Sequence, residues 1–446
     1  MKIFKTSSFG QEIDSQSVEA NFADLHPRLD NSNAIIEAAK CLYCYEAPCQ
    51  TACPTAIDIP KFIKQIQTEK PEDAAITILS ENIMGGTCAR ACPTEELCEQ
   101  VCVVHHTHGA PVKIGELQRY AVDALMAKDE KHPFEREAKT GKTFAVIGAG
   151  PAGLSFAHRA AMFGHDVKIF EAKSKPGGLN EYGLAEYKMA DDFARRETEF
   201  LLAIGGIEIA YDQALGDELT LEKLQSEFDG VFIGVGLGDN RSLDIAGADL
   251  KGIQNATDFI AQLRQAEIKS AVNVGDNVMV IGGGNTAIDA AVQARCLGSK
   301  NVTLVYRRGH EDMSATGWEC ELATANGVRI IPWAAPHSFE GDEHSRVKIA
   351  HFARTKLVDG KLEVTKEQIA IPADMVLKAI GQLYECPALS ALEMRGNKIS
   401  VNDSYETSLS GIYAGGDCVA TGEDLTVQAV EDGKQAAIAA HQWVMG

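Results

Sequence analysis

Eight of the twelve cysteines lie in one N-terminal stretch, at spacings that could support metal chemistry. They form two groups, Cys41-x₂-Cys44-x₄-Cys49-x₃-Cys53-Pro54 and Cys88-x₃-Cys92-Pro93-x₄-Cys98-x₃-Cys102. Thiolates so close in sequence converge on common centres and bind zinc or iron–sulfur clusters. The two cysteine–proline endings favour iron–sulfur clusters, because ferredoxin-type runs end in the same way. Structural zinc and disulfides are the alternatives.

A glycine-rich segment follows, in which TFAVIGAGPAGLSFAHRAAMFGHDVKIFE spans residues 143–171. An apolar run typical of a strand ends at Gly148, a helical pattern follows, and a second strand closes at Glu171. Gly148, Gly150 and Gly153 hold the G-x-G-x-x-G positions, which permit a tight turn, close approach of a pyrophosphate and close helix packing. Glu171 is placed to accept hydrogen bonds from a ribose 2′-hydroxyl. The segment predicts a dinucleotide site, and an ordinary strand–turn–helix corner is the alternative.

A second copy of the pattern, NVMVIGGGNTAIDAAVQ, lies further along the chain. Gly282, Gly284 and Ala287 take its three small-residue positions. Its second strand ends in Arg307 and Arg308 where the first copy has an acid. Two guanidiniums suit a 2′-phosphate, so the pattern favours NADP(H) over NAD(H). Solvated surface arginines are the alternative reading of the pair.

These motifs need a scaffold of several domains, and the length and composition of the chain are compatible with such a scaffold. The chain has 446 residues, enough for two to four domains, with 45% hydrophobic and 24% charged residues. A net charge of −21 argues against nucleic acid or an anionic membrane as a partner. We expect a cytoplasmic location, because the sequence shows neither an apolar stretch that would span a bilayer nor an apolar secretory core at its start.

The segment TSLSGIYAGGD at 407–417 resembles the T-x₆-A-x-G-D motif of FAD-dependent pyridine-nucleotide reductases. The resemblance implies that Asp417 contacts the ribityl–phosphate region of FAD, and that a helix starting near Thr426 directs its N-terminus at the isoalloxazine. It covers about residues 142–446, and it implies FAD in the first site and NAD(P) in the second. No two cysteines after Cys102 are close in sequence, so internal dithiol chemistry is not expected.

From about Leu25 onward the chain resembles the electron-input portion of the dihydropyrimidine dehydrogenase family. The resemblance rests on the cysteine pattern, on TCARACPTEELCEQVC and on PVKIGELQRYA ahead of the FAD/NAD(P) body. The small subunit of glutamate synthase shares this layout and is the nearest competitor. The resemblance assigns one [4Fe–4S] cluster to Cys41, Cys44, Cys49 and Cys102, and the other to Cys53, Cys92, Cys98 and Gln118. A glutamate is expected at position 118 in glutamate synthase subunits, so Gln118 favours the pyrimidine enzyme. Cys88 has no ligand role in this scheme and is expected to be a buried thiol.

The expected fold class is α/β. Two Rossmann-like dinucleotide-binding domains, with the NAD(P) domain inserted in a discontinuous FAD domain, follow an N-terminal α-helical iron–sulfur domain. The expected boundaries are 1–137 for the helical domain with two clusters, 138–251 and 377–446 for the FAD domain, and 252–376 for the NAD(P) domain. Residues 231–238 and 375–381 look like the strands that cross between the domains. Asp58, just before Pro60, is expected to cap a helix.

The motifs and the resemblance together give the following candidate ligands. For FAD they are Gly148, Ala149, Gly150, Pro151, Ala152, Gly153, Glu171, Gly178, Leu179, Lys188, Gly416, Asp417 and Thr426. For NADP they are Gly282, Gly283, Gly284, Asn285, Thr286, Arg307, Arg308, Ala379 and Gly381. Lys188 matches a family position near the flavin, where a cation could stabilise reduced flavin, and a surface lysine is the alternative. We expect no other catalytic side chain, because hydride transfer between cofactors requires positioning rather than acid–base chemistry.

The resemblance implies an oxidoreductase subunit that takes a hydride from NAD(P)H onto FAD and passes single electrons through two [4Fe–4S] clusters. The expected partner in a hetero-oligomer is an FMN-containing catalytic subunit that reduces uracil or thymine. A glutamate synthase small subunit or a more general adaptor of the NAD(P)H:ferredoxin type is the alternative. Members of the family that use NADPH carry a further arginine where this chain has Ser314, so NADH use remains open.

Overall fold

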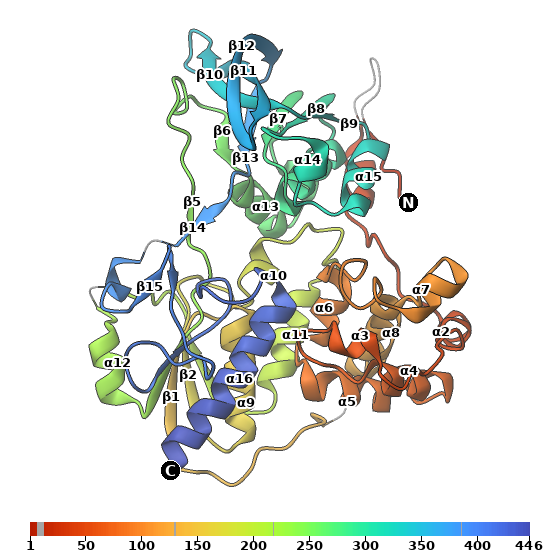
Figure 1. The fold of residues 1–446 in the computed structure, drawn as a ribbon, viewed down its shortest axis with the longest axis vertical. Coiled ribbons are helices and arrows are strands. Elements are labelled where there is room, and N and C mark those ends of the chain that lie inside the picture. The colour runs from red at the N-terminus through yellow and green to blue at the C-terminus, as the bar shows by residue number, and fades with distance from the viewer. Residues whose placement is uncertain (7–12, 129–130, 217, 385) are drawn as a thin grey trace. The chain divides into compact units, whose positions relative to one another are not determined.

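The computed structural model describes residues 1–6, 13–128, 131–216, 218–384 and 386–446. These residues divide into two compact units, each with its own parallel sheet (Figure 1). Unit 1 comprises Met1–Leu25, Tyr182–Ala190 and Asn240–Gln382. Unit 2 comprises His26–Glu181, Asp191–Asp239 and Leu383–Gly446. Within the described ranges, no helix has the length and apolar character needed to cross a membrane.

Unit 2 begins with a helical head. Its helices are α2 (Asn31–Ala38), α3 (Pro48–Thr51), α4 (Ile59–Gln67), α5 (Pro71–Glu81), α6 (Gly85–Ala91), α7 (Val103–His108) and α8 (Ile114–Met126). Helix α4 forms as predicted: the Asp58 carboxylate accepts a hydrogen bond from the Lys61 backbone N–H at 3.1 Å. Its buried residues, among them Phe62, Ile63 and Ile66, recur at helical spacing and face the core.

The remainder of unit 2 is built on a five-stranded parallel sheet. The strands, in spatial order, are β17 (Ile412–Ala414), β4 (Gly230–Ile233), β1 (Thr143–Ile147), β2 (Asp166–Phe170) and β3 (Ile207–Ala210). In the register, Thr143 lies opposite Asp166, and Phe144 lies opposite Gly230. The glycine turn after β1 therefore lies at the carboxyl edge of the sheet, where ligands bind in such folds.

Two helices of unit 2 pack on each other, α9 (Pro151–Met162) and α16 (Thr426–Met445). The Phe156 ring of α9 stacks on Phe232 of the sheet, with the ring centroids 4.5 Å apart. The same hydrophobic core continues into the helical head, so the head and this sheet domain bury one shared core. The smaller elements are α10 (Leu179–Tyr182), α11 (Phe193–Leu202), α12 (Leu221–Glu227), a 3₁₀ turn (Pro387–Leu389), β15 (Met394–Arg395) and β16 (Lys398–Ile399).

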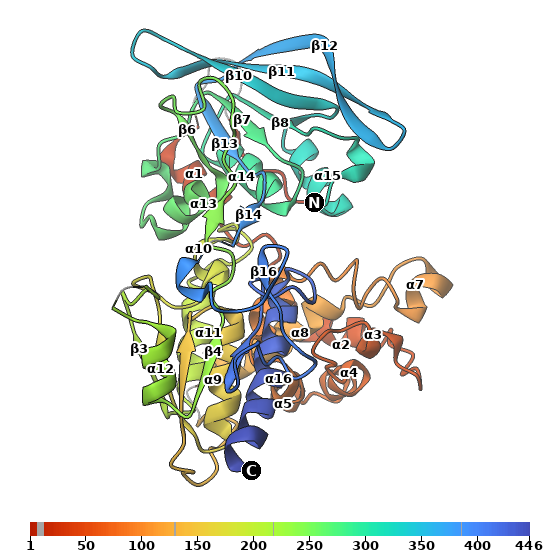
Figure 2. The same ribbon diagram turned by 60° about the vertical axis from the view of Figure 1, so that its left-hand side comes forward.

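Unit 1 repeats the architecture with a second parallel sheet (Figure 2). Its strands, in spatial order, are β6 (Ile253–Asn255), β13 (Met375–Lys378), β7 (Asn277–Ile281), β8 (Asn301–Val305) and β9 (Val328–Ile331). Its helices are α1 (Ser15–Asn21), α13 (Ala256–Gln265), α14 (Asn285–Cys296) and α15 (Gly317–Ala325), with 3₁₀ turns at Lys269–Ala271 and His310–Asp312.

An antiparallel sheet also belongs to unit 1, and the sequence patterns did not indicate it. It consists of β10 (Ala334–Gly341), β11 (Val347–Val358) and β12 (Lys361–Pro372). The N-terminal segment, expected in the helical head, packs instead on unit 1. The Phe4 backbone N–H donates to Asn326 Oδ1 at 2.7 Å, and Asn21 Nδ2 donates to the Cys296 carbonyl at 3.0 Å. Buried aromatic residues of this segment extend the core of unit 1.

The units divide at 239/240 and 382/383, whereas the sequence placed the inserted domain at 252–376. The strands β4 and β13, which looked like crossovers, are internal strands of their own sheets. The crossing is made by two short strands that pair with each other, β5 (Asp239–Asn240) and β14 (Gln382–Leu383). The buried runs at 231–233 and 376–377 are apolar because both of their faces are covered in a parallel sheet.

Candidate cofactor sites

Backbone atoms pack so tightly against the first glycine turn that they leave no room for side chains at Gly148 and Gly153. Gly148 has φ +96°, and a Cβ atom there would lie 2.5 Å from the Gly234 carbonyl oxygen. A Cβ on Gly153 would lie 2.0 Å from the Gly148 carbonyl oxygen, and one on Gly178 would lie 2.9 Å from Gly150 Cα. Helix α9 starts directly after Gly150, so its free N–H groups face the turn. The turn forms a cradle that suits a pyrophosphate.

Glu171 follows β2 and lies against this turn. Its Oε2 accepts a hydrogen bond from the Ala149 N–H at 2.7 Å, and its Oε1 accepts one from the Lys173 N–H at 2.8 Å. The buried carboxylate is thus fixed beside the glycine turn. Each oxygen retains a further lone pair for a ribose hydroxyl.

Asp417 lies at the other end of the predicted flavin site. Burial, and then the nearby Asp424, raise the pKa of Asp417 to about 6. A carboxyl held in such a position gains from a hydroxyl donor, which a ribityl chain would supply. Helix α16 begins at Thr426, as predicted, and Thr426 Oγ1 donates to Asn180 Oδ1 at 3.2 Å. These residues fit FAD.

A cavity of about 570 Å³ in unit 1 contains the second glycine motif. The predicted residues on its walls are Gly282, Gly283, Gly284, Thr286, Arg307, Ala379 and Gly381. The ring of Tyr306 covers Gly283, where a Cβ atom would lie 2.6 Å from the ring. The size and walls of the cavity suit a nicotinamide dinucleotide.

Two predicted residues do not line this cavity, and two unpredicted cationic residues, Arg241 and Lys378, do. Asn285 accepts a hydrogen bond from the Thr316 N–H at 3.1 Å, and Arg308 lies outside the cavity wall. Arg241 lines the cavity next to Gly381, whose carbonyl accepts a hydrogen bond from the Arg241 backbone N–H at 3.1 Å. No sequence pattern indicated Arg241, because its position depends on the pairing of β5 with β14.

Lys188 has partners that the sequence did not indicate. Its buried ammonium lies 2.6 Å from Asp289 Oδ1 and 2.5 Å from Glu319 Oε1, all within unit 1. Burial by itself lowers the pKa of Lys188, but the two carboxylates outweigh burial and raise it. Lys188 is therefore not the surface lysine of the alternative reading, and its contact with flavin stays a prediction.

The structure sorts the cysteines of the head between two cavities. Cys41, Cys44, Cys49 and Cys102 line the first cavity, together with apolar residues of α4 and α8. Cys53, Cys88, Cys92, Cys98 and Gln118 line the second. The two groups match the two predicted ligand sets, with Cys88 added to the second. Cys88 is buried, as expected.

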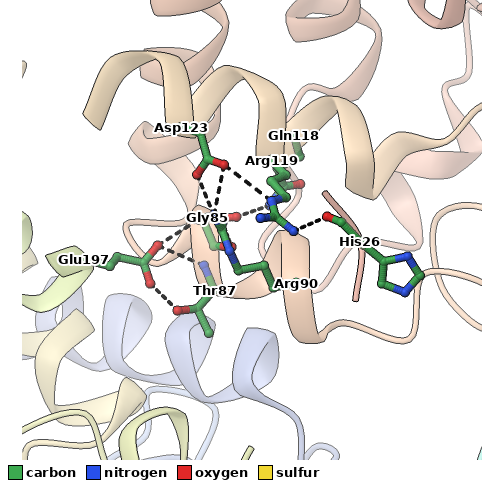
Figure 3. A network of polar contacts seen from close by, with 9 residues as sticks. His26, Gly85, Thr87, Arg90, Gln118, Arg119, Asp123 and Glu197 are labelled. Carbon is green, nitrogen blue, oxygen red and sulfur yellow. Dashed lines mark hydrogen bonds and ion pairs between the residues drawn. The ribbon is translucent and has the colours of Figure 1, made fainter. Parts of the chain in front are cut away.

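The second cavity also touches the start of α16. Val427, which follows Thr426, is one of its lining residues. Gln118 is held in the wall by its Nε2, which donates to the Gly85 carbonyl at 2.7 Å (Figure 3). This leaves the amide oxygen of Gln118 as the atom suited to bind iron.

The surroundings of the cysteines disfavour their thiolate forms unless a bound cation compensates. Burial, and then Cys41, raise the pKa of Cys49 to about 12. A hydrogen bond from the Cys92 thiol to Cys88, and then burial, raise the pKa of Cys92, and burial and Glu99 raise that of Cys98. Bound iron would reverse these costs and favour the thiolates. Among the described residues, no three His, Cys, Asp or Glu side chains are placed to share one metal ion.

Helix α6, which lines the second cavity, is anchored by a buried acid that the sequence did not reveal (Figure 3). Glu197 of α11 accepts hydrogen bonds from the backbone N–H groups of Gly86 at 2.8 Å and Thr87 at 3.0 Å, and from the Thr87 hydroxyl. Burial raises the pKa of Glu197 to about 7, although these hydrogen bonds lower it. Farther along α6, Arg90 forms an ion pair with Asp123 of α8 at 2.7 Å.

Comparison with known proteins agrees with this arrangement. Residues 18–130 match the family described as dihydropyrimidine dehydrogenase domain II, 4Fe-4S cluster, and residues 142–433 match the pyridine nucleotide-disulphide oxidoreductases. The NAD-dependent dihydropyrimidine dehydrogenase subunit PreT of Escherichia coli K12 is 32% identical, over 96% of this chain and 98% of that protein. The subunit of the same name from Salmonella typhimurium is 30% identical, over 96% and 98%. The chain belongs to the dihydropyrimidine dehydrogenase subunit family.

As a member of this family, the chain is an NAD(P)H-dependent flavin oxidoreductase with an iron–sulfur domain, and the predicted family is confirmed. Solved structures support the predicted fold class. Mycobacterium tuberculosis FprA in complex with NADPH has a TM-score of 0.56 at 18% identity, over 68% of this chain and 84% of that one. Thioredoxin reductase from T. acidophilum has a TM-score of 0.52 at 20% identity, over 68% and 100%. At these identities the likeness shows the fold alone.

Proposed function

We propose that the chain takes a hydride from a nicotinamide dinucleotide onto FAD and sends single electrons through two [4Fe–4S] clusters to an FMN-containing partner subunit, which reduces uracil or thymine. The observation that carries the proposal is the start of α16. Thr426 begins the helix that is predicted to direct its N-terminus at the flavin, and the next residue, Val427, lines the second cysteine cavity. A cluster in that cavity would lie within electron-transfer reach of the flavin.

The protein residues act by binding and positioning. The glycine turn at Gly148 and the carboxylates of Glu171 and Asp417 would hold FAD, which supplies the exchange between a two-electron donor and one-electron acceptors. The cysteine cavities would hold the clusters among apolar residues, which exclude water and fix the thiolates. No side-chain acid or base is needed for the hydride, because the cofactors supply the chemistry.

The position of the first cavity supports an exit toward a partner. Leu42 lines this cavity and has an exposed fraction of 51%. A cluster there would therefore lie close to the surface of unit 2. We infer the order FAD, second cavity, first cavity and partner. The name of the relatives, a dehydrogenase subunit, supports a hetero-oligomer. Thiols that must stay reduced to bind clusters fit the cytoplasm.

We propose NADH as the preferred donor, which revises the expectation of NADP(H). Of the two arginines after β8, only Arg307 lines the cavity, so the pair of guanidiniums predicted at the end of this strand is not available to a 2′-phosphate. The relatives are named NAD-dependent. The ratio of kcat/KM for NADH and NADPH tests this point, and Arg307→Leu should reduce kcat/KM for NADPH more than for NADH.

Anaerobic co-expression with a candidate FMN-containing subunit tests the main proposal. The complex should oxidise NADH with uracil or thymine as acceptor. Cys49→Ser should abolish this reaction while NADH oxidation with ferricyanide persists, because the flavin remains intact. Cys386→Ala, a cysteine outside both cavities, is the matched control and should retain both activities.

Two outcomes contradict the proposal. One is wild-type protein that contains flavin but neither iron nor acid-labile sulfide. The other is undiminished uracil reduction by Cys49→Ser. Activity with a glutamate synthase large subunit, but not with the FMN-containing subunit, would assign the chain to the competing class.

A further inference from the structure

The second cavity contains more donors than a cubane cluster needs. Such a cluster takes four protein ligands, one for each iron. Cys53, Cys92, Cys98, Gln118 and Cys88 all line the cavity. The family resemblance assigns no ligand role to Cys88, although its thiol lines the same cavity as the four assigned ligands.

Cys88 and Gln118 are held close to each other by the packing of α6 on α8. Gln118 Nε2 donates to the carbonyl of Gly85, which lies one helical turn before Cys88 on α6. Cys88 and Cys92 lie four positions apart, at opposite ends of one helical turn, and their thiols are in hydrogen-bonding contact. Cys88 lines the cavity and has an exposed fraction of 2%, so its side chain is shielded from bulk solvent.

The wall that carries Cys88 is fixed by contacts remote from the thiols. Glu197 binds the first N–H groups of α6, and Arg90 binds Asp123 of α8 through two hydrogen bonds of 2.7 and 2.9 Å. These anchors keep α6 in place when a side chain in the cavity is changed. The Cys88 sulfur therefore stays at the cavity wall in variants of Gln118.

The two donors differ in their affinity for iron. A thiolate is a soft, anionic ligand, whereas the Gln118 amide oxygen is neutral and is readily displaced. We propose that Cys88 is a reserve ligand of the second cluster, which binds the fourth iron whenever Gln118 does not hold it. This inference rests on the proposed cluster in the second cavity.

The exchange changes ligands and not the oxidation state of the iron. The bond from iron to Gln118 Oε1 breaks, the Cys88 S–H bond breaks, and a bond between iron and Cys88 Sγ forms. The proton passes to water. The cluster gains one negative charge from its ligands, so its reduction potential falls.

The test compares Gln118→Leu with the double variant Gln118→Leu/Cys88→Ala, reconstituted anaerobically as the full chain. Iron and acid-labile sulfide are counted per chain, and each cluster is followed by EPR during a redox titration. Gln118→Leu should keep the full iron content of the wild type, with the potential of one cluster shifted downward. The double variant should lose half of the iron and one EPR signal.

Two controls make each outcome decisive. Cys88→Ala alone should keep the full iron content, because Gln118 still binds the iron. Gln118→Leu/Cys386→Ala should behave like Gln118→Leu. Flavin content reports folding, and Gln118→Ala replaces Gln118→Leu if the leucine prevents folding.

The inference is overturned if Gln118→Leu already loses half of the iron, or if the double variant keeps all of it. It is also overturned if Cys88→Ala alone loses half of the iron, since Cys88 would then be the resident ligand. Wild-type protein without iron would instead contradict the proposed function, and the iron count separates the two failures.

Discussion

Replacing Lys188 by methionine removes the cation from a buried cluster in which it pairs with two carboxylates. The Lys188 ammonium lies 2.6 Å from Asp289 and 2.5 Å from Glu319, and the three side chains have exposed fractions of 10%, 6% and 10%. Methionine preserves most of the stem and its packing. The change therefore isolates the loss of charge, and it leaves two carboxylates in one buried site.

Breaking such a buried ion pair by removing one partner typically costs about 3–5 kcal/mol, because the remaining charge is uncompensated. The exposed pair Arg195–Glu199, at 2.7 Å with exposed fractions of 50% and 60%, provides the contrast. Removing an exposed pair costs about 0–1 kcal/mol. With a urea m-value of about 2 kcal/mol per molar, Lys188→Met should lower the unfolding midpoint of unit 1 by roughly 1.5–2.5 M. Arg195→Met should barely change it.

Tryptophan fluorescence can follow unit 1 separately. Trp318 and Trp333 belong to unit 1 and Trp443 to unit 2, so urea unfolding in a Trp443→Phe background reports unit 1. Neutralising the carboxylates with Asp289→Asn and Glu319→Gln should restore part of the loss. The reasoning is refuted if Lys188→Met shifts the midpoint no more than Arg195→Met does. An unchanged midpoint together with an altered flavin potential would instead support the predicted contact with flavin.

Three further predictions concern pH and the flavin turn. Burial raises the pKa of Glu197 from its ordinary 4.5 to about 7 in the folded chain, so the free energy of unfolding should fall as pH rises from 4.5 to 7. Glu197→Gln should flatten this pH dependence in urea titrations, and an unchanged slope would contradict the assignment. Burial lowers the pKa of His165 from 6.5 to about 4, so its contribution to the free energy of unfolding should be fully present above pH 6.5 and be lost toward pH 4. His165→Gln should reduce the loss of stability measured between pH 7 and 5. Gly153→Ala should abolish FAD retention, because the added Cβ would lie 2.0 Å from the Gly148 carbonyl oxygen. The control Gly317→Ala should retain FAD, because its Cβ would meet no atom within 4 Å. Equal flavin content in the two variants would contradict the steric argument.

The sequence by itself determined the local chemistry of this protein. Glycine turns, alternation of strand and helix, and the Asp58 cap depend on the conformations available to a few neighbouring residues. These features predicted the two parallel sheets and the start of α16 at Thr426, and the structure contains them. The same patterns, with the cysteine spacing, carried the resemblance that the comparisons confirmed.

Tertiary structure decided which distant groups meet. The partners of Lys188, the anchoring of α6 by Glu197 and the place of Arg241 in the dinucleotide cavity join segments far apart in the chain. Spacing alone does not separate Cys98 from Cys102, which lie in one short run and yet line different cavities. Local periodicity carries no information about such contacts, because burial, and with it each pKa, is set only when remote elements close around a side chain.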